Sequence, residues 1–238
     1  MVMADTIEAR LKRVQDRITE AALACGRDPT TVKLVAVSKT VAVNRVLAAI
    51  IGGVTHLGEN YVQEARDKIE ALGEQTVSWH FIGHLQSNKA KYVVKLFDLI
   101  HSVDSFKLAK ELDKRARAMG KVQEVLVQVN ISGETTKSGV ETEKAVALVR
   151  QMALLDHLAI RGFMTMPPYF NAPEKVRPFF RALKELQDLI RAESIPNVHM
   201  AELSMGMTGD FEAAIQEGAT LVRIGTAIFG ERSQAASG

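Results

Sequence analysis

The strongest constraint on the fold is a repeated alternation between short apolar runs and longer segments with helical spacing. The runs are rich in Val, Ile and Leu, as buried strands are. They occupy residues 32–38, 54–60, 78–83, 98–104, 124–130, 158–165, 200–206 and 220–225. Between them, apolar residues recur every three or four positions, for example at Leu108, Leu112 and Ala116. Strands that alternate with helices predict βαβ units and a parallel sheet.

Eight such units in a chain of 238 residues favour a closed (β/α)8 TIM-type barrel, which typically needs about 250 residues. A doubly wound open sheet is the alternative. We find no linker and no break in composition, so residues 1–238 are expected to form a single domain with a short polar tail from about residue 232. The first helix is expected to begin with Asp5 as its cap and to carry Cys25 as its last apolar position.

Composition excludes several classes of protein. Hydrophobic residues make up 47% of the chain, which is enough for a sizeable core. The net charge is only +2 and no run of basic residues is interleaved with aromatics, so no nucleic-acid surface is expected. No stretch reaches the roughly 18 apolar residues of a membrane span, and the N-terminus lacks an export signal. A single cysteine also fits a reducing compartment, so we expect a cytoplasmic protein.

The residues at the ends of the expected strands indicate where a ligand would bind. In such barrels the active site forms at the C-terminal ends of the strands. Those ends carry Ser38 and Lys39, Glu59 and Asn60, Gly83 and His84, Ser102 and Asp104, Asn130, Thr165, Ser204, and Gly225 and Thr226. Small and polar side chains therefore gather on one rim. The six histidines are scattered and lack the spacing of a metal site, so we predict no metal.

The last two strand ends resemble phosphate-binding loops. "LSMGMTGD" and "RIGTAIFG" each place a hydroxyl side chain and a glycine before an expected helix, at Ser204 and at Gly225–Thr226. Free backbone N–H groups and the helix dipole favour an anion there. Such barrels frequently bind phosphate after strands seven and eight. The alternative is that both loops are ordinary caps and turns.

Lys39 and Arg223 suggest the chemistry of the rim. The first and eighth strands of a closed barrel are neighbours, so an inward-pointing Arg223 would lie near Lys39. A nearby cation and a partly dry setting lower the pKa of a lysine, as Schiff-base chemistry requires. Alternatively, Lys39 reaches for water and Arg223 pairs with a carboxylate. A phosphate pocket beside a Schiff-base lysine describes a pyridoxal 5′-phosphate (PLP) site or a lysine aldolase that acts on a sugar phosphate.

Seven motifs taken together are specific. "VAVSKT", "GENYVQEA", "WHFIGHLQSNK", "VNISGETTKSG", "GFMTMPP", "LSMGMTGDFEAAI" and "VRIGTAIFG" occur in this order from about residue 30 to about residue 230. In this respect the chain resembles the YggS/proline synthase co-transcribed (PROSC) family of pyridoxal phosphate homeostasis proteins. The resemblance implies the barrel that also forms the N-terminal domain of alanine racemase. It implies a protein that binds PLP and affects vitamin B6 balance, without established catalytic turnover.

The resemblance also assigns roles to residues. It makes Lys39 the Schiff-base lysine, and it places Asn60 near the cofactor ring and Arg223 at the pyridine nitrogen. Ser204, Gly225 and Thr226 would hold the phosphate. No residue is assigned a catalytic role.

Two features of the sequence favour a carrier over an enzyme. A permanently charged arginine at the pyridine nitrogen disfavours its protonation and weakens the cofactor as an electron sink. The racemases that share this barrel take a second acid–base group from another domain, for which this chain has no room. We therefore expect a monomeric PLP carrier that could supply PLP-dependent apo-enzymes. A weak amino-acid racemase is the alternative.

Overall fold

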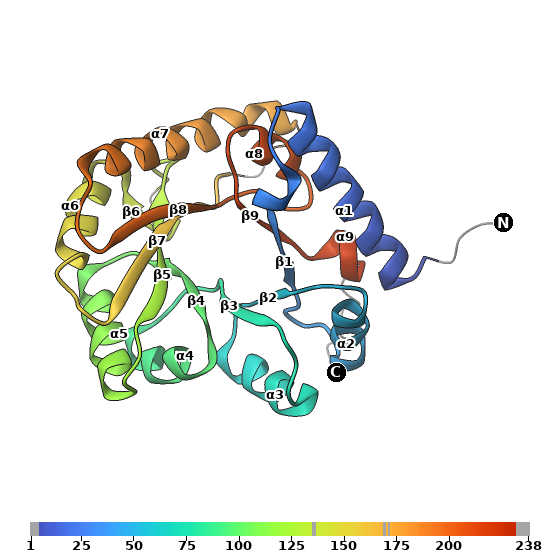
Figure 1. Ribbon diagram of the computed structural model, residues 1–238, viewed down its shortest axis with the longest axis horizontal. Helices are drawn as coiled ribbons and strands as arrows, with labels where there is room; N and C mark the ends of the chain where they lie inside the picture. The colour runs from blue at the N-terminus through green and yellow to red at the C-terminus, as the bar shows by residue number, and fades with distance from the viewer. Residues whose placement is uncertain (1–4, 135–136, 169, 171, 232–238) are drawn as a thin grey trace.

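A ring of parallel strands surrounded by helices forms the body of the protein (Figure 1). The computed structural model describes residues 5–134, 137–168, 170 and 172–231. The strands of the ring are β1 (Lys33–Val37), β2 (His56–Glu59), β3 (Ser78–Phe81), β4 (Leu99–Val103), β5 (Gln123–Asn130), β7 (Leu158–Met164), β8 (Val198–Ser204) and β9 (Leu221–Ile224). All eight coincide with the runs expected from the sequence.

The ring closes through two pairings. Strand order runs β4-β3-β2-β1-β9-β8-β7-β5, and a further parallel pairing between β4 and β5 joins the ends. The first and last strands are neighbours in register, with Val35 opposite Arg223. A two-residue strand, β6 (Val140–Glu141), adds to the end of β5 outside the ring. The closed (β/α)8 barrel is therefore confirmed over the doubly wound sheet.

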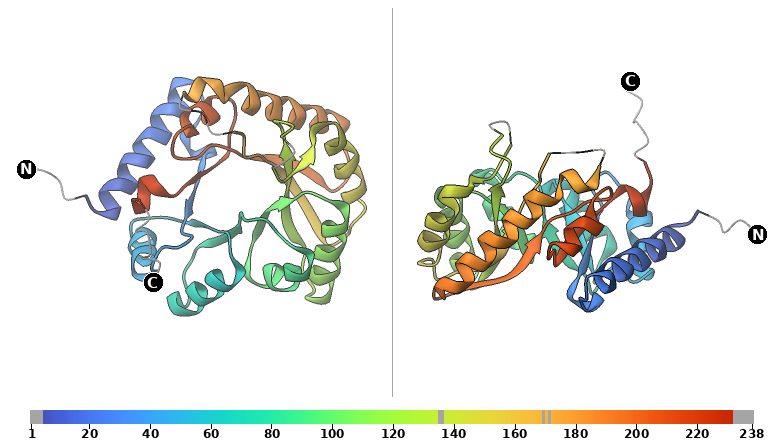
Figure 2. Two further views of the ribbon diagram at one scale, coloured as in Figure 1. Left: turned by 180° about the vertical axis from the view of Figure 1, so that it is seen from behind. Right: turned by 90° about the horizontal axis from the view of Figure 1, so that it is seen from above.

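Helices form the outer layer, which Figure 2 shows from behind and from above. They are α1 (Ile7–Ala24), α2 (Val43–Ile51), α3 (Val62–Leu72), α4 (Ala90–Leu96), α5 (Phe106–Ala118), α6 (Thr142–Met152), α7 (Arg177–Glu193), α8 (Phe211–Gln216) and α9 (Thr226–Phe229). Short 3-10 turns precede β1 (Pro29–Thr31), α4 (Ser87–Lys89) and α7 (Pro173–Lys175). No helix in the described part of the chain is both long and apolar enough to cross a membrane.

The start of α1 differs from expectation. Thr6 caps the helix, because its hydroxyl oxygen accepts a hydrogen bond from the backbone N–H of Ala9. Asp5 instead forms ion pairs with Arg10 and Arg13, which an N-cap carboxylate could not reach while it bound the helix end. Cys25 lies just beyond the helix and is exposed, so its expected place in the apolar face was wrong. The helix packs against α8 and α9, next to the last strand.

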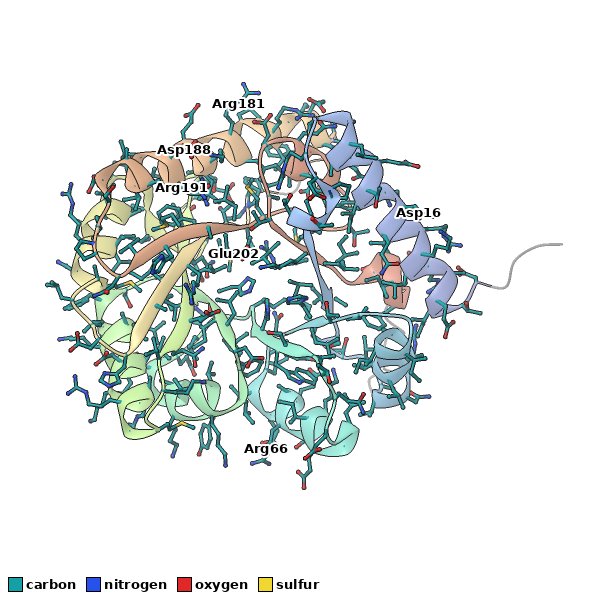
Figure 3. All side chains as sticks on the ribbon, viewed as in Figure 1. Asp16, Arg66, Arg181, Asp188, Arg191 and Glu202 are labelled. Carbon is teal, nitrogen blue, oxygen red and sulfur yellow. The ribbon has the colours of Figure 1, made fainter. Side chains whose placement is uncertain are left out.

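Two separate apolar regions stabilise the barrel. The large one lies between the strands and the helices. The small one lies inside the ring and consists of Val35, Leu99, Leu126, Met164 and Leu221. Figure 3 shows that side chains fill the ring. Much of that filling is polar, because buried His80, His101, Ser204 and Arg223 share the interior. The barrel interior is therefore a mixed core in which polar groups must find partners.

A glycine allows the loop after β3 to pack closely against the loop after β2. A Cβ atom added to Gly83 would lie 2.3 Å from the carbonyl oxygen of Asn60 and 2.8 Å from its Cα. Both are backbone atoms, which cannot turn aside as a side chain would. Only glycine therefore lets the two loops approach this closely.

We expect Gly83→Ala to destabilise the protein by about 1–3 kcal/mol, because the methyl group would push the Asn60 backbone away. Urea unfolding measures the change in the free energy of unfolding. Gly52→Ala is the matched control, since its Cβ would first meet the flexible end of Leu11 at 3.0 Å. Equal effects of the two substitutions would contradict this account.

Candidate functional site

The pairing of β1 with β9 brings the candidate residues of both strand ends to one rim. Because Val35 lies opposite Arg223 in a parallel pair, the residues that follow each strand also run side by side. Lys39 follows β1, whereas Gly225 and Thr226 lead from β9 into α9. The first N–H groups of a helix lack partners within the helix, so the turn at Thr226 presents donors. The rim thus combines an amine with N–H groups suited to an anion.

Arg223 lies below this rim, inside the barrel, with 4% of its surface exposed. Its Nη1 donates to the Ser204 hydroxyl at 2.5 Å, and its Nη2 donates to the carbonyl oxygen of Thr165 at 2.9 Å. Burial lowers the pKa of Arg223 to about 10, so the guanidinium stays charged at neutral pH. The side chain points inward, as expected. Its hydrogen-bond partners here are a hydroxyl and a carbonyl rather than the carboxylate of the alternative reading.

The backbone around Lys39 is held in place by its neighbours. Lys39 is half-buried after β1. The next residue, Thr40, has a φ of 62°, an unusual value for a β-branched residue, and its N–H donates to the Glu64 carboxylate. On the other side, the ammonium group of Lys68 donates to the carbonyl oxygen of Ser38. Both anchors come from α3, so that helix positions Lys39.

A buried ion pair supports these anchors. Lys68 Nζ lies 2.7 Å from Glu59 Oε1 and 2.7 Å from Glu64 Oε1. The Ser38 hydroxyl donates to the same Glu59 oxygen at 2.7 Å. Burial raises the pKa of Glu59, and the hydrogen bonds from Lys68 and Ser38 act against that rise. Sequence reasoning missed Lys68, although its spacing of four from Glu64 on a helix is a signal for an ion pair.

Asn60 joins the rim from the end of β2. Its side-chain oxygen Oδ1 is buried and has no hydrogen-bond partner among the described residues. A buried acceptor without a partner is costly, and a ligand that donates a hydrogen bond would satisfy it. Asn60 therefore fits its expected place near a bound cofactor.

Ser204 lies deeper than the other expected residues. It is fully buried, whereas Thr226 is exposed at the rim and Gly225 is half-buried. Its hydroxyl contacts Arg223 and, at 2.9 Å, the Nδ1 atom of His101. The structure thus brings Lys39, Gly225 and Thr226 together at the rim and sets Ser204 with Arg223 beneath it.

Comparison with known proteins identifies the family. Residues 5–233 match the alanine racemase N-terminal domain family. The chain is 48% identical over 223 residues to the pyridoxal phosphate homeostasis protein of Aquifex aeolicus, covering 94% of this chain and 97% of that protein. The chain therefore belongs to the alanine racemase N-terminal domain family, as one of the pyridoxal phosphate homeostasis proteins. The homeostasis protein of Escherichia coli K12 is 42% identical, over 95% of this chain and 97% of its own length.

Solved structures agree with this assignment. PipY of Synechococcus elongatus, solved with PLP bound, has a TM-score of 0.82 and 33% identity, with 94% of this chain and 100% of PipY covered. An alanine racemase of Clostridium difficile has a TM-score of 0.73 at 16% identity, over 95% of this chain and 58% of the racemase. The second likeness concerns the fold alone.

In this family member, a chain of hydrogen bonds crosses the barrel beneath the rim. From Ser204 it passes to His101 at 2.9 Å and from His101 Nε2 to His80 Nδ1 at 3.0 Å. It continues from His80 Nε2 to Ser78 Oγ at 3.2 Å and from Ser78 to Asp98 Oδ2 at 3.2 Å. Ser78 begins β3, so the chain leads from the cofactor side to the opposite mouth of the barrel.

The carboxylate sets the direction of every proton in this chain. Burial lowers the pKa of His80 to about 3 and that of His101 well below its usual value, so both rings are neutral. The Ser78 hydroxyl donates to Asp98 Oδ2, so it accepts from His80 Nε2–H. His80 Nδ1 then accepts from His101 Nε2–H, and His101 Nδ1 accepts from the Ser204 hydroxyl. Ser204 therefore uses its one hydroxyl hydrogen to donate a hydrogen bond to His101.

This direction makes Ser204 a positioning residue. Since its hydroxyl hydrogen points to His101, its oxygen lone pairs face Arg223 and accept from it. The guanidinium thus has a fixed acceptor below the rim. The two buried histidines, for which the sequence predicted no metal-binding role, act through this serine on a residue of the candidate site.

We expect Lys68→Met to destabilise the protein by about 3–5 kcal/mol, because it leaves the Glu59 carboxylate buried without its cation. Urea unfolding at pH 7 measures the free energy of unfolding. The double variant Glu59→Gln/Lys68→Met should recover much of the loss, since no buried charge remains. A Lys68→Met protein as stable as the parent would show that the pair is not buried in solution.

The histidine chain predicts a pH dependence of stability. Both folded-state pKa values lie below the unfolded value near 6.5, so only the unfolded chain gains protons as the pH falls below it. Stability is therefore fully present above pH ~6.5 and falls by up to about 1.4 kcal/mol per pH unit for each histidine. Urea unfolding between pH 7 and pH 5 measures the slope.

The double variant His80→Phe/His101→Phe should flatten this slope, whereas His199→Gln, at an exposed histidine, should not. Nitrogen-15 NMR of the parent protein should show both buried rings with the proton on Nε2. A proton on Nδ1 of His101 would reverse the direction assigned to the chain.

Proposed function

We propose that this protein binds PLP and acts in vitamin B6 homeostasis, holding the cofactor as a Schiff base on Lys39. The observation that carries the proposal is the β1–β9 pairing, which sets Lys39 beside Gly225 and Thr226 above a buried arginine. The relatives named as pyridoxal phosphate homeostasis proteins, and PipY with PLP bound, support it.

The residues present fit the cofactor. The unpartnered Oδ1 of Asn60 offers an acceptor at the rim. A Cβ atom on Gly225 would lie 3.3 Å from the carbonyl oxygen of Val37, so a side chain there would crowd β1. We assign the phosphate to the turn at Gly225 and Thr226, where backbone N–H groups are available.

Arg223 would face the pyridine nitrogen, with Ser204 holding the guanidinium from below. PLP supplies an electron sink whose strength depends on protonation of that nitrogen. Arg223 remains charged at neutral pH, and its charge disfavours a second positive charge beside it. The site is therefore suited to holding the cofactor rather than to reactions that need a strong sink.

Delivery to other proteins follows from this role. We propose that the protein works in the cytoplasm as a monomer and passes PLP to PLP-dependent apo-enzymes. The support is the position of Thr226 at an exposed rim, from which a ligand could leave.

Addition of PLP should give a yellow protein that borohydride bleaches, with one pyridoxyl group on Lys39. Visible absorbance and peptide mass spectrometry measure the two effects. Lys39→Ala should abolish both, because it removes the amine that the anchors from α3 place at this rim. Lys33→Ala is the matched control, since Lys33 begins the same strand at the opposite mouth and pairs with Glu202 at 2.6 Å.

A colourless protein, or a label distributed equally over both variants, would overturn the Schiff base on Lys39. Delivery is tested separately by mixing the loaded protein with an apo-enzyme acceptor. Recovery of acceptor activity no faster than with free PLP released into the same buffer would remove the transfer step.

A further inference from the structure

A cavity lies beside the candidate cofactor residues, on the outer side of the rim. It has a volume of about 640 Å³ and is lined by residues that follow β2 and β3 and by residues of α3 and α4. This volume is within the range of roughly 300–1,000 Å³ typical of small-molecule sites. The cavity shares Asn60 with the candidate site, but Lys39, Arg223 and Thr226 do not line it. It is therefore a neighbouring site and not the cofactor site itself.

The charge of the cavity favours an anion. Arg66 and Lys89 line it, and no carboxylate does. Figure 3 places Arg66 at the outer edge of the barrel, on α3. The ion pair that the structure gives Arg66 among the described residues is a loose one, with Asp67 at 3.7 Å. Glu64, from the same helix, is turned to Lys68 instead. Both cations are thus available to a ligand.

Nearby cations lower the pKa of Tyr92, a tyrosine in the wall of the cavity. A hydrogen bond from Lys91 lowers the pKa of Tyr92, and the charges of Lys89 and Arg66 add to the effect. The Lys91 ammonium also lies 4.6 Å from the centre of the Tyr92 ring. A phenol that is easier to ionise reports a positive local potential.

The walls favour a flat organic molecule over a bare ion. Tyr61 and Tyr92 line the cavity with 61% and 42% of their surfaces exposed. Buried Phe81 and Leu85 contribute apolar surface to the same cavity. Exposed aromatic rings beside cations are suited to stacking on a ring that carries negative charge.

We propose that this cavity is a second ligand site, which binds a phosphorylated aromatic small molecule without a covalent bond. Arg66 and Lys89 bind the phosphate, and the tyrosines stack on the ring. Two cations match a phosphate dianion better than a carboxylate. The inference stands on the cavity and does not rest on chemistry at Lys39.

The test uses pyridoxine 5′-phosphate, which has a phosphate and an aromatic ring but no aldehyde. The protein is first loaded with PLP and reduced with borohydride, so that Lys39 and its surroundings are occupied. Calorimetric titration should then show one further site. Arg66→Gln/Lys89→Gln should weaken binding at least about tenfold, as expected when charge-assisted hydrogen bonds are lost.

Lys107→Gln/Lys114→Gln on α5 is the matched control, because it removes the same charge from another exposed face and should leave binding unchanged. Pyridoxine, which lacks the phosphate, should bind at least about tenfold more weakly than its phosphate. No saturable binding to the reduced protein, or equal loss in both double variants, would overturn the proposal. If reduction attaches no pyridoxyl group to Lys39, the proposed function fails, whereas comparison of the variants still decides whether the cavity binds.

Discussion

A permanent positive charge inside the barrel is the constraint to which the surrounding structure responds. Arg223 has 4% of its surface exposed, and a buried cation is costly unless every donor is satisfied. Ser204 and Thr165 provide acceptors, and the Ser204 oxygen faces Arg223 because its hydroxyl hydrogen points to His101. The chain of hydrogen bonds from Ser204 to Asp98 therefore occupies space that apolar side chains would otherwise fill. The apolar residues inside the ring form one small cluster.

The outer side of the rim follows a different design. There Glu64 and Lys68 of α3 fix the backbone on both sides of Lys39, and the buried ion pair of Lys68 with Glu59 supports them. Lys39 is thus placed by a helix that contributes none of the residues proposed to touch the cofactor. Beneath the rim the charge is fixed by neutral partners, whereas around the rim the backbone is fixed by charged ones.

The sequence predicted the architecture well because its signals are local. Each strand of the ring lies within a short run rich in apolar residues, and alternation with helices leaves few other topologies. Local chemistry also sets the start of α5, where the hydroxyl of Ser105 accepts a hydrogen bond from the backbone N–H of Leu108. The sequence could not show whether Asp5 or Thr6 caps α1, since both residue types are common helix caps. The ion pairs of Asp5 with Arg10 and Arg13 decide between them.

The site was predictable only in part. Strand ends placed Lys39, Asn60, Gly225 and Thr226 on one rim, because parallel strands share an edge. The depth of Ser204 and the roles of His80, His101 and Lys68 depend on which side chains meet across the barrel. Those contacts join residues up to 103 positions apart, such as His101 and Ser204, and no local pattern encodes them.

The pairing of β1 with β9 has a consequence for biosynthesis. It joins Lys33 to Leu221, so the ring cannot close until almost the whole chain has left the ribosome. Residues 5–200 could form several βαβ units, yet they would lack both the neighbour of β1 and the turn at Gly225. A nascent or truncated chain would therefore expose Lys39 without the groups that make it a cofactor site. The rim at which Lys39, Gly225 and Thr226 meet is therefore assembled only after β9 has been synthesised.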